Sequence, residues 1–208
     1  MNDMKTIIKV CGMTQGDNIQ AVEALGVDWM GFIFYDRSPR HVVKRPCYMP
    51  QRAQRVGVFV NAPIEDIRCQ IEAYGLHYVQ LHGDESPLFC SEVASWGVGV
   101  IKAFSLSEAS DLAATRCYEG CCSYYLFDTK TQHLRGGSGT MFDWQLLAAY
   151  DGATPFLLSG GIGPEQIGAL RSFQHALWAG IDLNSRFESA PGVKDVALLQ
   201  AFINELKQ

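Results

Sequence analysis

Several short apolar segments of the chain end in a residue that can exchange a proton. Cys11, His82, Asp128 and Asp182 each stand at or just beyond the end of such a segment. A thiol, an imidazole and carboxylates are the side chains that most often serve as general bases, general acids or nucleophiles. Their repeated placement after apolar segments predicts an enzyme.

Cationic and glycine-rich stretches follow other apolar segments. Arg40 lies in the SPR stretch after the second segment, and Gly160 and Gly161 follow the seventh. Glycines let a backbone approach a ligand closely, and a helix start beyond them offers free amides to an anion. Together with Ser185, which follows the last segment, they indicate a phosphate site, whereas the glycine pair alone is also explained by a tight turn.

The apolar segments are too continuous for a half-exposed sheet. There are eight of them, and we interpret each as a strand covered on both faces: 6–10, 29–34, 55–60, 78–82, 98–104, 123–128, 155–159 and 176–182. Helical spacing and helix end signals lie between most of them, at 16–26, 62–75, 85–97, 105–116, 142–150, 163–173 and 193–208. The segment after the second strand is broken by Pro39, Pro46 and Pro50, so we expect no helix there.

Eight strand–helix units favour one α/β domain, a (β/α)₈ TIM barrel over residues 1–208. The 208 residues shared among eight units give about 26 residues each, compact but sufficient for such a barrel. An open doubly wound sheet is the alternative, although its usual G-x-G-x-x-G turn is absent after the first strand. A barrel would place the strand-end residues together, since functional groups there lie at the C-terminal ends of the strands.

Composition excludes several other classes of protein. The net charge is −5 with scattered Lys and Arg, so no nucleic-acid surface is expected. The N-terminal apolar run is too short for a secretory signal or a membrane span, so we expect a cytoplasmic protein with no membrane partner. The seven cysteines show no Cys-x-x-Cys pair or Cys/His ligand set, which indicates reduced thiols and no metal.

Each candidate also has a purely structural interpretation. Cys11 taken alone is more often a buried core thiol, and His82 alone is more often a packed side chain bonded to a carbonyl. Two other functions stay open: a thiol hydrolase using Cys11, His82 and Asp128, and a catalytically idle barrel that binds a sugar phosphate as a sensor or scaffold.

Taken together, seven stretches resemble one enzyme family. They are KVCGMT (9–14), GFIFYDRSPRHV (31–42), VGVFVN (56–61), VQLHGDE (79–85), FDT with GGSGTMFDW (127–129 and 136–144), LSGGI (158–162) and GIDLNSRFESAPGVKD (180–195). In order and spacing they are similar to phosphoribosylanthranilate isomerase, a (β/α)₈ barrel of tryptophan biosynthesis. Arg186 departs from the pattern, because the family usually has glycine there; we expect either an altered turn or a cation brought toward the phosphate.

The resemblance implies the reaction and the roles of individual residues. The family converts N-(5-phosphoribosyl)anthranilate to 1-(2-carboxyphenylamino)-1-deoxyribulose 5-phosphate by an Amadori rearrangement, without cofactor or metal. By resemblance, Cys11 is the general base and Asp128 the general acid. Arg40 holds the anthranilate carboxylate, and His82 lines the same pocket. Backbone amides around Gly160, Gly161, Asp182 and Ser185 cradle the phosphate.

These assignments set a requirement on the site. A free thiol has a pKa of about 8.5 and a free aspartic acid about 3.9, so near neutral pH each would mostly hold the unsuitable protonation state. We therefore expect nearby cations to lower the pKa of Cys11 and apolar walls to favour protonated Asp128.

The glycine-rich loop 129–140 is expected to close over the substrate. The sequence leaves monomer and homodimer equally open.

Overall fold

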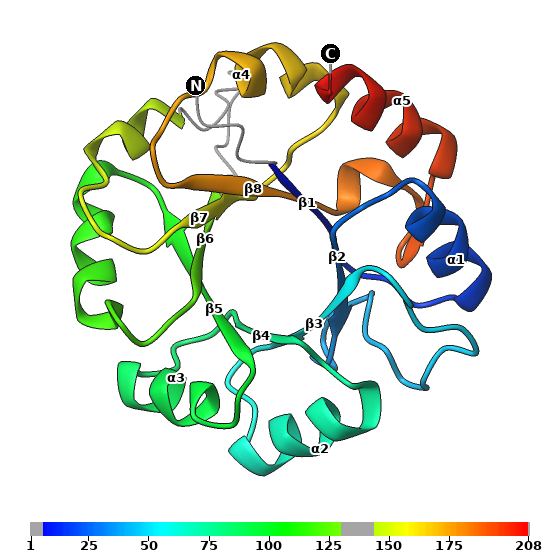
Figure 1. Cartoon of the computed structure of the whole chain (residues 1–208), viewed down its shortest axis with the longest axis horizontal. Helices are drawn as coiled ribbons and strands as arrows, with labels where there is room; N and C mark the ends of the chain where they lie inside the picture. The colour runs from blue at the N-terminus through cyan, green and yellow to red at the C-terminus, as the bar shows by residue number, and fades with distance from the viewer. Residues whose placement is uncertain (1–5, 130–143, 208) are drawn as a thin grey trace.

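Eight parallel strands close into a barrel in the computed structural model, which describes residues 6–129 and 144–207 (Figure 1). The strands are β1 (Ile7–Val10), β2 (Trp29–Ile33), β3 (Gln54–Phe59), β4 (Tyr78–Leu81), β5 (Gly99–Leu106), β6 (Tyr124–Thr129), β7 (Phe156–Leu158) and β8 (Trp178–Leu183). β1 pairs with β8, Ile7 opposite Gly180 and Val10 opposite Leu183, and this pairing closes the barrel. The (β/α)₈ prediction is confirmed, and the open-sheet alternative is wrong.

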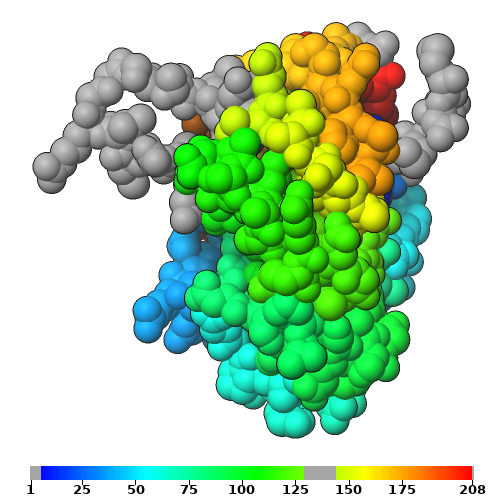
Figure 2. Space-filling model, turned by 90° about the vertical axis from the view of Figure 1, so that its left-hand side faces the viewer, coloured from blue at the N-terminus to red at the C-terminus, as the bar shows by residue number. Residues whose placement is uncertain are grey.

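Helical segments surround the barrel, and several are short or of the 3-10 type (Figure 1). They are α1 (Gly16–Ala24), α2 (Ile64–Tyr74), α3 (Pro87–Ala94), η1 (Ala109–Tyr118), η2 (Trp144–Ala149), η3 (Pro164–Gln166), α4 (Ile167–Ser172), η4 (Ser185–Phe187) and α5 (Val196–Leu206). Figure 2 shows η1 in green and η2 in yellow-green on the same side of the molecule, where they contact each other. As expected from its prolines, the segment between β2 and β3 contains no helix.

The barrel has apolar residues on both sides of its strands, as near-continuous hydrophobic runs require. Outward-facing residues pack beneath the helices in the larger core cluster. A second cluster fills the barrel interior, where Trp29 stacks on Tyr78 with ring centroids 4.4 Å apart. Ile7 packs against this inner cluster. Because strand side chains alternate between faces, Lys9 and Cys11 follow Ile7 along the interior toward the C-terminal mouth.

A short hairpin follows the barrel strands. β9 (Glu188–Ala190) and β10 (Val193–Lys194) pair antiparallel between η4 and α5. The side chain of Asn18 in α1 fixes the hairpin, since its Oδ1 accepts from the Lys194 amide (2.8 Å) and its Nδ2 donates to the Lys194 carbonyl (2.9 Å). Over the two described ranges, no helix combines the length and the apolar character that a membrane crossing requires.

Candidate active site

A cavity of about 210 Å³ opens at the C-terminal ends of the strands. Seven of the eight residues predicted for the site line it: Cys11, His82, Asp128, Gly160, Gly161, Asp182 and Ser185. The other lining residues are Ile33, Val58, Gln80, Ser159, Ile162 and Asn184. Arg40 is outside this set. The barrel thus brings together residues up to 174 positions apart in the sequence, Cys11 and Ser185 among them.

Cys11 occupies a space that a neighbouring glycine leaves open. The thiol residue is only 3% exposed. A Cβ atom on Gly31 of the adjacent strand β2 would lie 2.6 Å from the sulfur and 3.1 Å from the Cys11 Cα. Any side chain at position 31 would therefore push Cys11 out of place.

A buried lysine lies between Cys11 and Asp182. Lys9 is fully buried, and its Nζ forms an ion pair of 2.9 Å with Oδ1 of Asp182. Lys9 on β1 stands two residues before Cys11, so the two side chains lie on the same face of the strand. Burial opposes the charge on Lys9, but Asp182 and Cys11 outweigh it and raise the pKa of the lysine. Lys9 is therefore a cation within the barrel.

The structure corrects the expectation for the Cys11 pKa. Burial is the largest influence and raises the pKa of the thiol, while Lys9 and Lys194 lower it by a smaller amount. The predicted cations are present, but the prediction that they lower the pKa overall is wrong. Removing a thiolate from water by burial disfavours it more than these cations favour it.

Asp128 is held by a histidine rather than by a lysine. Nε2 of His82 lies 3.2 Å from Oδ2 of Asp128, and both side chains are about one-third exposed. On the other side of the ring, Gln80 Nε2 donates to His82 Nδ1 over 3.0 Å. With Nδ1 accepting, the ring proton is on Nε2 and is donated to Asp128. The two hydrogen bonds of the His82 ring therefore go to Asp128 and Gln80.

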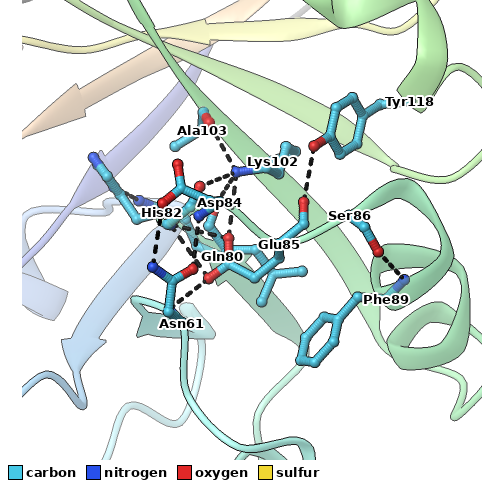
Figure 3. Close-up of polar contacts among 12 residues, drawn as sticks. Asn61, Gln80, His82, Asp84, Glu85, Ser86, Phe89, Lys102, Ala103 and Tyr118 are labelled. Atoms are coloured by element: carbon cyan, nitrogen blue, oxygen red, sulfur yellow. Dashed lines mark hydrogen bonds and ion pairs between the residues drawn. The ribbon is translucent and has the colours of Figure 1, made fainter.

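A buried ion pair fixes the turn that carries His82 (Figure 3). Lys102 Nζ donates to the carbonyls of Leu81 (3.2 Å) and Gly83 (2.7 Å), and lies 3.3 Å from Oε2 of Glu85. Glu85 Oε1 in turn accepts from the amide of Asn61 at the end of β3 (2.8 Å). The two loops after β3 and β4 are therefore joined through one carboxylate.

Arg40 is engaged by a glutamate of the hairpin. Its Nε and Nη2 donate to both carboxylate oxygens of Glu188, at 2.6–2.9 Å. Lys194 Nζ lies 2.7 Å from Glu188 Oε1 and donates to Asn184 Oδ1 at the same distance. Arg40 and Lys194 outweigh the effect of burial and lower the pKa of Glu188. The guanidinium is consequently anchored beside the cavity.

The turn after β7 contains two successive glycines with positive φ. Gly160 and Gly161 have φ values of 90° and 71°, a left-handed conformation that side chains rarely permit. Ser185 starts the short helix η4, which also contains Arg186. Among the described residues Asn61 is the one non-glycine with positive φ, so Arg186 needs no glycine-like turn. Arg186 is exposed, and its charge helps to lower the pKa of Glu165 in η3.

Two expectations have no test in this structure. The loop 129–140, expected to close over the substrate, lies outside the described residues apart from Thr129. Within the described ranges, no three His, Cys, Asp or Glu side chains are grouped so as to hold a metal ion. The expectation of chemistry without metal or cofactor stays a prediction.

Some residues of the site were missed from the sequence. Lys9 could have been found from the sequence, because it stands two positions before Cys11 in an apolar strand and so shares its face. Gln80 has the same relation to His82. No sequence pattern identifies Glu188 or Gly31, since their contacts with Arg40 and Cys11 join segments that only the barrel brings together.

The fold and the mouth define a class of protein, the (β/α)₈-barrel enzymes. Such enzymes carry their chemistry at the C-terminal ends of the strands, where this chain gathers its thiol, imidazole and carboxylates. Comparison with known proteins then narrows the class. The family model for N-(5'-phosphoribosyl)anthranilate isomerase matches residues 8–205.

Individual relatives agree over nearly the whole chain. An N-(5'-phosphoribosyl)anthranilate isomerase of Phocaeicola vulgatus is 53% identical, over 97% of this chain and 98% of the relative. The isomerase of Parabacteroides distasonis is 49% identical, over 96% and 93%. The crystal structure of the Thermotoga maritima isomerase aligns with a TM-score of 0.83 at 33% identity, over 98% of this chain and 99% of that one. The chain belongs to the phosphoribosylanthranilate isomerase family, whose members are isomerases of tryptophan biosynthesis.

Proposed function

We propose that this isomerase converts N-(5-phosphoribosyl)anthranilate to 1-(2-carboxyphenylamino)-1-deoxyribulose 5-phosphate, with Asp128 as general acid and Cys11 as general base. The observation that carries the proposal is the cavity itself, which both side chains line. A solved isomerase of the family, 30% identical with a TM-score of 0.81, is in complex with the reduced form of that product.

The first step is opening of the ribose ring. Asp128 gives its proton to the ring oxygen, the C1′–O bond breaks, and the nitrogen lone pair forms an iminium. His82 supports this role, because its Nε2–H donates to Oδ2 of Asp128 and leaves Oδ1 to carry the proton that is transferred. The hydrogen bond therefore selects which oxygen faces the substrate.

The second step removes the C2′ proton. The Cys11 thiolate takes it, the electron pair forms the C1′=C2′ bond, and the iminium becomes a neutral enolamine that tautomerises to the ketone. A raised pKa makes the thiolate scarcer, but it also makes it a stronger base. Proton transfer by positioned groups contributes about 10²–10⁴-fold to rate.

We assign the two ends of the substrate to two separate groups of residues. We assign Arg40 to the anthranilate carboxylate, and Glu188 already orients its guanidinium. We assign the phosphate to the backbone around Gly160, Gly161, Asp182 and Ser185, all of which line the cavity. Arg186 on η4 adds positive charge to that group of residues.

The two alternatives have weaker support. A thiol hydrolase needs an imidazole bonded to the sulfur, and His82 is bonded to Gln80 and Asp128. An idle sensor barrel has no use for a base and an acid on one cavity. The cytoplasmic location stays a prediction, and no oligomeric state is proposed.

The loss of substrate fluorescence tests the proposal. Phosphoribosylanthranilate is generated in situ, and its disappearance is followed with the wild type, Cys11→Ser and Asp128→Asn. Both variants should lose about 10²–10⁴-fold in kcat. Cys69→Ser is the matched control, because Cys69 is an exposed thiol on α2 and should leave kcat unchanged. Full activity in Cys11→Ser or Asp128→Asn would refute the corresponding assignment, and an inactive wild type would refute the substrate.

A further inference from the structure

We propose that Lys9 is a positioning residue for the general base: its buried ammonium, paired with Asp182 and two residues before Cys11 on the same face of β1, sets how much of Cys11 is thiolate. The inference rests on the proposed function, in which Cys11 removes the C2′ proton. It assigns a role to a residue that lies below the cavity and is absent from its lining.

The burial of Lys9 limits what it can contact. Lys9 is fully buried, so it binds no solvent and no ligand directly. Its ion-pair partner is the Asp182 carboxylate at 2.9 Å, and the Cys11 side chain lies on the same face of β1 two residues on. A buried charge is costly unless paired, and the pair of Lys9 with Asp182 places one cation of the site close to the thiol.

Charged groups from several elements face Cys11. Lys9 on β1, Lys194 on β10 and Arg40 after β2 are the cations that act on the sulfur. Asp182 on β8 opposes them, and Glu188 on β9 neutralises part of Arg40 and Lys194. Burial raises the pKa of Asp182, and the ion pair with Lys9 opposes this effect. With both carboxylates ionised, the three cations leave one positive charge, which a thiolate would neutralise.

Farther across the mouth, His82 and Asp128 act on Asp182 rather than on the sulfur. Their effects on the carboxylate oppose each other, since the aspartate raises the pKa of Asp182 and the histidine lowers it. Lys9 and Asp182 are therefore the adjacent pair with opposite influence on Cys11. Ionisation of Cys11 releases its proton to the solvent of the cavity, and the sulfur keeps the electron pair beside Lys9.

Lys9 and Asp182 carry opposite charges, so removing each one should shift the midpoint of Cys11 ionisation in opposite directions. Thiolate formation is followed by ultraviolet absorbance as pH is raised, and each protein is compared with the same protein carrying Cys11→Ala, so that the difference reports Cys11 alone. Lys9→Met should move the titration midpoint upward by at least one pH unit, a tenfold lower thiolate-to-thiol ratio. Asp182→Asn should move it downward. Lys44→Met removes the same charge at an exposed position and should leave the midpoint unchanged.

A purely structural lysine gives a different result. If Lys9 only filled space, Lys9→Met and Asp182→Asn would leave the midpoint unchanged or shift it in the same direction, and either result would overturn the inference. Should Lys9→Met fail to fold because Asp182 loses its partner, the double variant Lys9→Met/Asp182→Asn removes both charges. Its midpoint should lie above that of Asp182→Asn alone; equal midpoints would also overturn the inference.

The same variants separate this inference from the proposed function. The thiolate signal reports ionisation whether or not Cys11 is the base. If Lys9→Met moves the midpoint of Cys11 ionisation as predicted, and the rise of kcat/KM with pH moves by the same amount, the role of Lys9 and the assignment of Cys11 as base are both supported. If the midpoint moves and the kinetic profile does not, the role of Lys9 in ionisation stands and the assignment of Cys11 as base fails.

Discussion

At the scale of single residues, two neighbours determine the environment of the Cys11 sulfur. The positive charge of Lys9 favours the thiolate, and Gly31 has no side chain that would collide with the sulfur. Sequence patterns located Cys11 and Asp128 because a strand end is visible as the end of an apolar run. They did not reveal the value of the Cys11 pKa, since burial depends on every strand around the sulfur.

Gly31→Ala tests the room that the sulfur needs. The added Cβ would lie 2.6 Å from Sγ and close to the Cys11 backbone, so the thiol must shift. Misplacement of a catalytic atom by about 1 Å can cost about 10²-fold, and we expect kcat in the fluorescence assay to fall by up to that factor.

Gly168→Ala is the control for this substitution. Gly168 lies in α4, and a Cβ there has no atom within 4 Å among the described residues. Alanine in a helix is favoured over glycine by about 0.5–1 kcal/mol, so the variant should keep its kcat and gain slightly in thermal stability. A Gly31→Ala enzyme as active as Gly168→Ala would contradict the packing argument.

At the scale of elements, the loops after β3 and β4 form one unit. Glu85 accepts from the amides of Asn61 and Gly83, and Asn61 Oδ1 accepts from the Asp84 amide (2.7 Å). Asn61 has a φ of 50°, an uncommon conformation that these bonds hold in place. The HGDE stretch drew attention for its histidine; its glutamate proves to be the residue that fixes the turn.

Glu85→Gln should destabilise the protein strongly. Removing one partner of a buried ion pair leaves the other charge uncompensated, at a cost of about 3 kcal/mol. Glu85 and Lys102 are both buried, each side chain 3% exposed. The free energy of unfolding, measured by chemical denaturation, should fall by about that amount.

Asp151→Asn makes the same chemical change in an exposed pair. Asp151 and Arg116 are joined at 3.1 Å but are about 70% exposed, so solvent screens their attraction. The unfolding curve of the Asp151→Asn variant should superimpose on that of the wild type. Equal effects of the two substitutions would show that the Glu85–Lys102 pair does not hold the turn.

At the scale of the whole molecule, the barrel was predictable because its repeat is simple. The regularly spaced apolar runs predicted the eight barrel strands. The prolines in segment 35–53 predicted that no helix follows β2. The kind of helix was less accessible: η1 and η2 are 3-10 rather than α, as local packing against the strands overrides a weak helical preference. The hairpin β9–β10, which holds Arg40, has no signal in strand periodicity because its strands are only three and two residues long.

The central claim at this scale is a division of labour across the mouth, with ring opening by Asp128 and proton abstraction by Cys11. Substrate deuterated at C2′ separates the two steps, because an isotope effect appears only when breaking the C2′–H bond limits the rate. Cys11→Ser should increase the isotope effect on kcat relative to the wild type, since abstraction becomes slowest. Asp128→Asn should reduce it toward one, since ring opening becomes slowest. Isotope effects that change in the same direction in both variants would contradict the account.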